Sequence, residues 1–275
     1  MISLTRQRTA TVIPTDFTGD TRKLWEKELL ENERKIKKGE LDRHKFLQSR
    51  WKKVKDQLKL EAYDKCAYCE APNSMVAYGD VEHYRPKSVY WWLAYNYDNY
   101  LVSCQLCNQS YKSDNFPVKN ARIKAPTITK TTKDDYILSI AGKCTPDPLD
   151  NSGMLLSEFI TAHNTERPYL LNPYFDEPAD YYAWRADDIL REVELVPLPN
   201  TTEFVQSAID YYGLNRKELR DLRYRIYYLY TGYKLVLTDT GISDITRRET
   251  KQRIEYMKGN KAPFAGMIRY FENLL

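Results

Sequence analysis

Four of the five cysteines fall into two CxxC pairs, and these pairs are the strongest chemical signal in the chain. The pairs are Cys66 and Cys69 in "CAYCE", and Cys104 and Cys107 in "CQLCN". Four thiolates with this spacing can close a tetrahedral zinc site that has no open position, which is a structural site. No apolar secretory leader is recognisable, so zinc is expected rather than disulfide bonds. The remaining cysteine, Cys144, is expected to be a lone thiol.

The segment between the pairs carries residues that could do chemistry of another kind. It is 34 residues long, against about 15 to 20 in a compact zinc ribbon, and it contains Glu82 and His83. Asn108 directly follows the last paired cysteine. Carboxylate and amide oxygens suit Mg²⁺ or Mn²⁺, and histidine can accept a proton at neutral pH. In a regular strand Glu82 and His83 would point to opposite faces, but at a bent strand end both could serve one site.

The elements around these residues can be predicted from local patterns. "DVEHYRP" alternates apolar and polar residues, which is typical of a strand that ends at Pro86. "YNYDNYLVSC" indicates a loop and a second strand, and "CQLCNQSYKSD" indicates a zinc knuckle that opens a helix. A strand pair followed by a helix would therefore carry the candidate site.

The N-terminal part is predicted to be an irregular arm over residues 1–20, followed by two helices that form a hairpin. The first helix begins near Asp20 and ends at Gly39, and the second covers residues 42–65. From Arg22 to Lys65 there are fifteen Lys and Arg but nine Asp and Glu. This excess indicates either a solvated helix face or a surface that faces phosphates.

The C-terminal part is predicted to be mainly helical. Residues 119–170 carry turn signals and indicate a loop-rich linker, and residues 181–198 indicate a small strand pair. Residues 202–237 are strongly helical, with Gly213 ending one helix and Asn215 capping the next. Two further helices are expected, over residues 243–258 and from residue 263 onward. The prediction is an α+β protein with three parts: 1–65, 66–118 and 119–275.

The central block resembles the HNH, or ββα-metal, nuclease family. The matching residues are Glu82 and His83 on the first strand, Asn99 in "YDNYLVSC" and Asn108 in "CQLCN". The resemblance implies a small zinc-clamped ββα-metal core in which His83 is the general base. It implies that Glu82 and Asn108 bind one divalent cation, Mg²⁺ or Mn²⁺, and that Asn99 braces the loop and orients His83. Glu82 replaces the family's frequent Asp and Asn108 its frequent His, but both keep an oxygen ligand.

Three cations near these residues could hold phosphate oxygens, or could be ordinary surface charges. They are Arg85, Lys87 and Lys112. Of the two remaining histidines, His44 is expected at the surface of the basic helix, and His163 is expected to have a structural role rather than a catalytic one.

A narrower resemblance covers residues 66 to about 223. "EHYRPK", "NYLVSCQLCNQSYKSDNFPV", "LLNPYFDEP" and "GLNRKELRDLR" are similar to the PtuB family, the HNH subunits of Septu-type and related retron anti-phage systems. The resemblance implies a bacterial defence effector that works with an ATPase of the ABC/AAA type.

The predicted function is that of a metal-dependent endonuclease acting on nucleic acid, with DNA preferred over RNA. The alternatives are a non-catalytic, zinc-organised binding or scaffold subunit of an ATPase complex, and a nuclease directed at RNA. The net charge of only +4 does not itself indicate a nucleic-acid partner. The longest apolar runs are far shorter than the roughly 20 residues of a membrane span, so a cytoplasmic protein without a membrane partner is expected.

Overall fold

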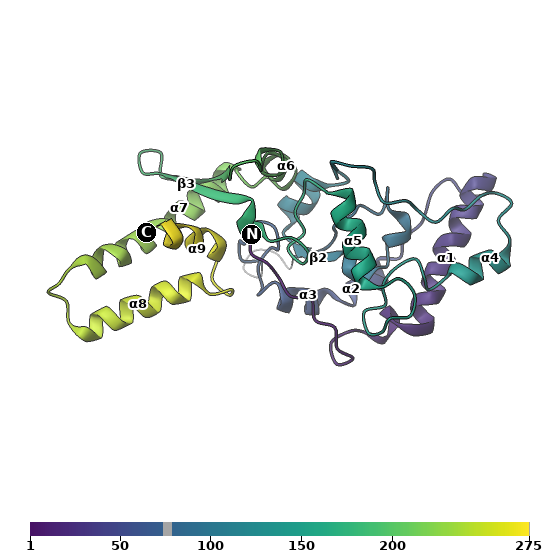
Figure 1. Ribbon diagram of the computed structural model, residues 1–275, viewed down its shortest axis with the longest axis horizontal. Helices are drawn as coiled ribbons and strands as arrows, with labels where there is room; N and C mark the ends of the chain where they lie inside the picture. Colours follow the sequence, from purple (N-terminus) through teal and green to yellow (C-terminus); the bar gives the residue numbers. More distant parts are fainter. Residues whose placement is uncertain (74–78, 275) are drawn as a thin grey trace.

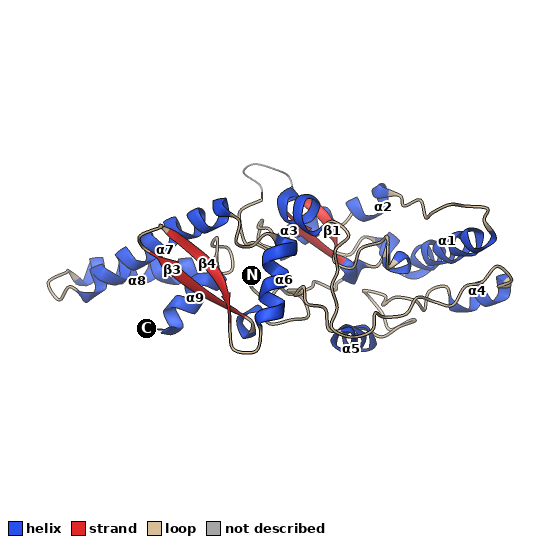
Figure 2. Cartoon of the chain, turned by 90° about the horizontal axis from the view of Figure 1, so that it is seen from above, coloured by secondary structure: helices blue, strands red, loops and turns tan. Residues whose placement is uncertain are grey.

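The computed structural model describes residues 1–73 and 79–274, and within them the fold is α+β (Figure 1). The molecule is elongated. Helices α1 (Gly19–Lys38) and α4 (Asp134–Ile140) lie side by side at one end, and α8 (Asp244–Lys258) lies at the other. Figure 2 shows the two small sheets between these ends. Each sheet has two strands.

The first N-terminal helix begins and ends as predicted, to within one residue. Helix α1 ends at Gly39, whose φ of 77° is the left-handed conformation that glycine adopts without strain. The prediction of one continuous helix over residues 42–65 was wrong. The structure has two short helices, α2 (Gln48–Lys52) and α3 (Lys55–Glu61), and no helix over 42–47. The amide of Leu47 donates to the Tyr95 hydroxyl instead of to a helical carbonyl.

The predicted strands of the central block are confirmed. Strand β1 (Asp80–His83) pairs antiparallel with β2 (Tyr100–Ser103), and His83 lies opposite Tyr100. The helical segment that follows is η4 (Leu106–Lys112), a π-helix rather than an α-helix. Its wider turn is closed by the Ser113 amide, which donates to the Asn108 carbonyl at 2.7 Å.

Residues 119–170 are predicted to be loop-rich, and most of this segment lies outside helices and strands. They contain α4 and α5 (Leu156–Glu166). The predicted strand pair follows, with β3 (Tyr182–Asp187) antiparallel to β4 (Glu192–Pro197). Short 3₁₀ turns lie at Thr15–Phe17 (η1), Trp91–Leu93 (η2), Tyr97–Asn99 (η3) and Pro178–Asp180 (η5).

The remaining helices are α6 (Thr202–Tyr212), α7 (Lys217–Thr238), α8 and α9 (Ala265–Leu274). Gly213 ends α6 in the left-handed conformation, as predicted. Asn215 does not cap α7. Its side chain instead donates to the Leu195 carbonyl and accepts from the Leu195 amide, so it fixes β4 to the start of α7. The Ser243 hydroxyl caps α8 by accepting from the Thr246 amide.

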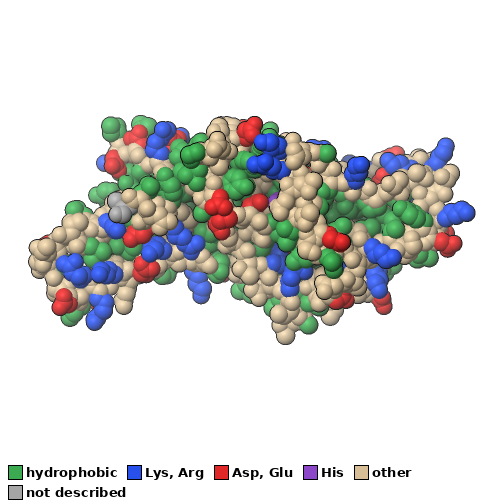
Figure 3. Space-filling view, viewed as in Figure 1, with side chains coloured by type: hydrophobic (Ala, Val, Ile, Leu, Met, Phe, Trp, Pro, Cys, Tyr) green, Lys and Arg blue, Asp and Glu red, His purple; other side chains and the backbone are tan. Residues whose placement is uncertain are grey.

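One hydrophobic core runs beneath the β1–β2 hairpin and is rich in aromatic side chains. All four residues of β2 are buried, and the Tyr84, Tyr90 and Tyr97 side chains are at most 1% exposed. Acidic and basic side chains are interspersed on the face drawn in Figure 3, in keeping with the small net charge. Among the described residues, no helix has the length and apolar character that crossing a membrane requires.

Candidate functional site

The four paired cysteines converge on one point. Their sulfur atoms all lie within 4.8 Å of one another, and the Sγ atoms of Cys69 and Cys104 are 4.0 Å apart. Tetrahedral zinc with bonds of about 2.3 Å places its sulfur ligands roughly 3.8 Å apart. All the cysteines are free thiols. The cluster can therefore hold a zinc ion with little movement.

Local hydrogen bonds tie the cysteine cluster to the β1–β2 hairpin. The Ala67 amide donates to the Val102 carbonyl at 3.0 Å, which attaches the first knuckle to β2. In the second knuckle the Cys107 amide donates to the Cys104 sulfur, and the Asn108 amide donates to the Cys104 carbonyl. These bonds fix where η4 begins, so the cluster sets the position of Asn108 relative to the strands.

The electrostatics of the cluster favour a cation at its centre. Burial raises the pKa of the Cys66 thiol well above its ordinary value, so four thiolates need a positive charge between them. Arg216, just before α7, adds charge from outside. Its guanidinium lies 3.5 Å from the Cys107 sulfur and 3.8 Å from the Cys69 sulfur. Burial opposes ionisation of Arg216, but the adjacent sulfurs outweigh it and raise its pKa.

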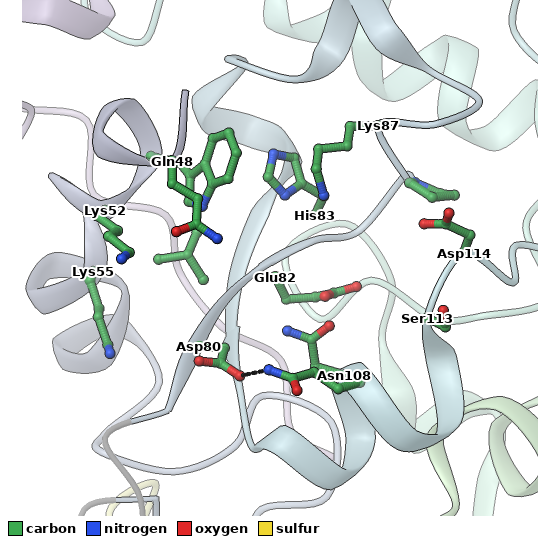
Figure 4. Close-up of a pocket in the computed structure, with 14 residues that line it drawn as sticks. Gln48, Lys52, Lys55, Asp80, Glu82, His83, Lys87, Asn108, Ser113 and Asp114 are labelled. Carbon is green, nitrogen blue, oxygen red and sulfur yellow. Dashed lines mark hydrogen bonds between the residues drawn. The ribbon is translucent and has the colours of Figure 1, made fainter. Parts of the chain in front are cut away.

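A cavity of about 590 Å³ opens beside this cluster, and three predicted site residues meet on its wall. Glu82 and His83 come from β1, and Asn108 comes from η4 (Figure 4). Both adjacent β1 residues reach the cavity because β1 ends at His83 and the chain bends at once. Lys87 also lines the cavity, whereas Asn99, Arg85 and Lys112 do not.

His83 is oriented to accept a proton. Its Nε2 atom lies 3.0 Å from the Ala94 carbonyl oxygen. A carbonyl can only accept, so Nε2 carries the hydrogen and Nδ1 keeps its lone pair. Burial lowers the pKa of His83 to about 3, and the nearby Lys87 adds to this effect. The imidazole is therefore neutral at pH 7. Trp51 and Tyr100 pack edge-on against the ring at 4.8 and 5.1 Å.

Lys112 holds Glu82 and is not available to a phosphate, contrary to the expectation for this lysine. Its ammonium nitrogen lies 2.6 Å from Glu82 Oε1 and donates to the His83 carbonyl at 3.1 Å. The Lys112 side chain is fully buried, and Glu82 is 4% exposed. Burial raises the pKa of Glu82, although Lys112 opposes the increase. Lys112 thus compensates the charge of the carboxylate from below the cavity.

Asn108 lies next to Glu82 on the cavity wall, half-buried (Figure 4). The residue after it, Gln109, donates from Nε2 to Asp80 Oδ2 at 2.9 Å. This bond links η4 to the start of β1. The Glu82 carboxylate of β1 and the Asn108 side-chain amide of η4 therefore lie side by side. The two elements are joined at one end by the bond from Gln109 to Asp80 and at the other by the bond from Lys112 to the His83 carbonyl.

Asn99 is the last residue of the loop that connects β1 and β2, and it is fully buried. Its Oδ1 accepts from the Arg85 amide at 2.8 Å, and its Nδ2 donates to the carbonyls of Arg85 and Leu93. Leu93 precedes Ala94, whose carbonyl accepts from His83. Asn99 thus joins the two ends of this loop to each other and to Leu93.

Arg85 is a structural residue, so the phosphate-binding role considered for it is wrong. Its side chain is 1% exposed and faces the interior. The guanidinium Nη2 lies 2.7 Å from Glu166 Oε2 and 3.2 Å from His163 Nδ1. Because both partners are on α5, the ion pair fixes this helix to the chain directly after His83. No phosphate can reach it without unpacking the core.

The other singled-out residues lie away from the cavity. His44 was expected at the surface, but it is half-buried, stacked on Trp91 at 4.9 Å and 2.9 Å from Glu33. His163 is buried between Arg85 and Asp176, which agrees with a structural role. Cys144 is a buried thiol near Ile140.

Several residues that line the cavity carry no recognisable motif in the sequence. They are Gln48, Trp51, Lys52, Lys55, Asp80 and Asp114. For Gln48, Lys52 and Lys55 there was one signal: they recur at intervals of four and three, which places them on one face of a helix. Only the fold shows that this face meets β1.

A divalent cation in the cavity would have few protein ligands. Among the described residues, the paired cysteines form the one group of three or more Cys, His, Asp or Glu side chains spaced for a metal. Glu82 and Asn108 together offer a sparse oxygen set. Such a set fits Mg²⁺, which keeps several waters and often binds substrate phosphates through one or two carboxylates. The donor types therefore fit a hard cation and leave room for substrate.

Comparison with known proteins gives one match. The Septu protein PtuB of Bacillus mycoides (strain KBAB4) is 26% identical over 186 residues, which cover 63% of this chain. The chain resembles PtuB. No family model and no solved structure matches. The match covers 50% of PtuB, so the chain corresponds to about half the length of that relative. The resemblance to PtuB expected from the sequence motifs is thereby confirmed.

Proposed function

We propose that this protein is a metal-dependent HNH endonuclease that hydrolyses phosphodiester bonds of nucleic acid. One observation carries the proposal: Glu82, His83 and Asn108 share one cavity wall, with His83 Nδ1 free to accept a proton. A β-hairpin followed by a helical segment presents these residues, in the order strand, strand, helix that a ββα-metal core has.

Each side chain then has a defined task. His83 accepts a proton from the attacking water at Nδ1, and its neutral state at pH 7 keeps that atom available. Glu82 and Asn108 would hold Mg²⁺ or Mn²⁺, which supplies stabilisation of the negative charge that develops on the phosphate. Asn99 keeps the Leu93–Ala94 backbone in place, and Ala94 fixes the ring orientation of His83. The four paired cysteines would bind a structural zinc ion.

DNA is proposed as the substrate in preference to RNA, and an anti-phage role together with an ABC/AAA-type ATPase partner is proposed from the resemblance to PtuB alone. The anti-phage role and the ATPase partner are properties of a whole defence system, whereas the chain matches about half of the relative. The proposal for the chemistry is independent of them, because it depends on the cavity.

The test is cleavage of supercoiled plasmid with Mg²⁺ or Mn²⁺, by the chain alone and by the chain together with any ABC/AAA-type ATPase that co-purifies with it. Wild type is expected to cut and to stop cutting in EDTA, and His83→Ala should be inactive while keeping its zinc. His44→Ala is the matched control, because this half-buried histidine also has a polar partner at Nε2 but lies outside the cavity. Equal cleavage by wild type and His83→Ala would remove His83 as the base. Binding without cleavage in both preparations would favour a non-catalytic subunit, and cleavage of RNA alone would favour the RNA-directed alternative.

A further inference from the structure

The wall of the cavity opposite β1 is built by a polar stripe on α2 and α3. Gln48, Lys52 and Lys55 line it and follow one another at helical spacing (Figure 4).

The stripe is held in a fixed position relative to His83. Trp51, Val54 and Leu58 occupy the adjacent face of the same helices, and all three are buried. The Trp51 ring meets the His83 ring edge-on, with centroids 4.8 Å apart and planes at 85°. Helix α3 also packs against both strands of the hairpin. A group bound to the stripe would therefore lie at a defined place relative to the proposed base.

The lysines of this wall differ from their neighbours in having no acidic partner. Within the described part of the chain, no carboxylate lies within ion-pair distance of Lys52, Lys55 or Lys87, and all three line the cavity. The two other lysines between Gln48 and Glu61 lie outside the cavity and are paired: Lys53 with Asp16 at 2.5 Å and Lys59 with Asp64 at 3.9 Å.

The two walls of the cavity thus carry charged groups of opposite sign. Asp80 and Glu82 lie on the β1 side, where Gln109 and Lys112 already contact them. Uncompensated ammonium groups lie on the α2–α3 side, and Lys87 lies above His83 (Figure 4). A polyanion would approach the cationic wall, since opposite charges that are partly shielded from water attract most strongly.

We propose that Lys52 and Lys55 bind backbone phosphates of the nucleic acid next to the scissile phosphate, with Gln48 as a hydrogen-bond donor at the end of the stripe. This inference rests on the proposed nuclease function and specifies how its substrate lies. The strand crosses the cavity between the α2–α3 stripe and the Glu82–His83–Asn108 wall. Of the fifteen basic residues between Arg22 and Lys65, these two face the site.

The salt dependence of DNA binding tests the inference. A fluorescein-labelled 30-base-pair DNA duplex is titrated with His83→Ala protein, without divalent cation, at several NaCl concentrations. The same titration is done with a triple variant that carries Lys52→Gln and Lys55→Gln in addition to His83→Ala. Each lost phosphate contact lowers the slope of log K against log[salt] by about 0.9, so a decrease of about 1.8 is expected. At 0.1 M salt this corresponds to roughly 60-fold weaker binding.

Two controls separate charge and position from folding. Lys52→Arg with Lys55→Arg should keep the parent slope, because the positive charges remain. Lys130→Gln with Lys133→Gln removes two exposed lysines far along the chain that do not line the cavity, and it should also keep the slope. An unchanged slope in the Lys52→Gln/Lys55→Gln protein, with normal thermal unfolding, would overturn the inference and leave the nuclease proposal standing. Absence of DNA binding by the His83→Ala protein, together with absence of plasmid cleavage by wild type, would overturn both the inference and the nuclease proposal.

Discussion

The variant Arg85→Met distinguishes a structural role of Arg85 from a role in binding substrate. Arg85 and Glu166 form an ion pair at 2.7 Å, and both side chains are at most 1% exposed. Removing one partner of such a pair leaves a buried charge without compensation and costs about 3 to 5 kcal/mol. Glu166 keeps the Tyr90 hydroxyl and the Ile123 amide as donors. We therefore expect a loss of about 3 kcal/mol in the free energy of unfolding.

The measurement is urea unfolding followed by circular dichroism. At about 2 to 4 °C per kcal/mol for a chain of comparable size, the midpoint of thermal unfolding should fall by roughly 6 to 12 °C. Arg43→Met, at an exposed position, should change the free energy of unfolding by no more than about 0.5 kcal/mol. The double variant Arg85→Met/Glu166→Gln should be more stable than Arg85→Met, because it removes the stranded charge while a side-chain oxygen still accepts from Tyr90.

The result that would refute this reasoning is an Arg85→Met protein with unchanged unfolding but weaker DNA binding. A decrease of about 0.9 in the salt slope would then show that the guanidinium contacts a phosphate.

Two further predictions concern the metals. Cys107→Ser should lower bound zinc, measured by inductively coupled plasma mass spectrometry, and destabilise the protein, because a structural zinc site contributes folding free energy; stoichiometric zinc with unchanged unfolding would contradict it, and Cys144→Ser is the control. Asn108→Ala should raise the Mg²⁺ or Mn²⁺ concentration for half-maximal plasmid cleavage, while zinc content stays unchanged; identical cation titration curves would exclude Asn108 as a ligand.

Local features of the fold could be read from the sequence because they depend on neighbouring residues. Gly39 and Gly213 end their helices because glycine adopts positive φ without strain. Each CxxC pair is typical of a zinc knuckle because of its spacing, and the fold brings the two pairs together. The alternation of apolar and polar residues predicted β1, although the strand ends at His83, three residues before Pro86. For the same reason the grouping of Glu82 and Asn108 on one wall could be anticipated from their places beside the knuckles.

What could not be predicted depends on contacts between distant segments. Arg85 and Lys112 look like surface cations in the sequence. Their acidic partners, Glu166 and Glu82, are 81 and 30 positions away in the chain, so only the fold shows that they are paired. Asn215 looks like a helix cap, yet β4 offers it two backbone bonds. The stripe with Lys52 and Lys55 was hidden because the interrupted helix places it opposite β1, which no local pattern indicates.

The π-helical form of η4 has a consequence for how this site can change over evolution. Lys112 pairs with Glu82 and Asn108 lies next to it, both from this one segment, and the 2.7 Å hydrogen bond from the Ser113 amide to the Asn108 carbonyl spans five residues. Loss of one residue between them would let the backbone close an ordinary α-helix, in which each residue turns by about 100°. Asn108 and Lys112 would then no longer meet Glu82 together. The number of residues between Cys107 and Ser113 is therefore constrained more strongly than the identity of the residues between Asn108 and Lys112, and substitutions should accumulate there more readily than insertions or deletions.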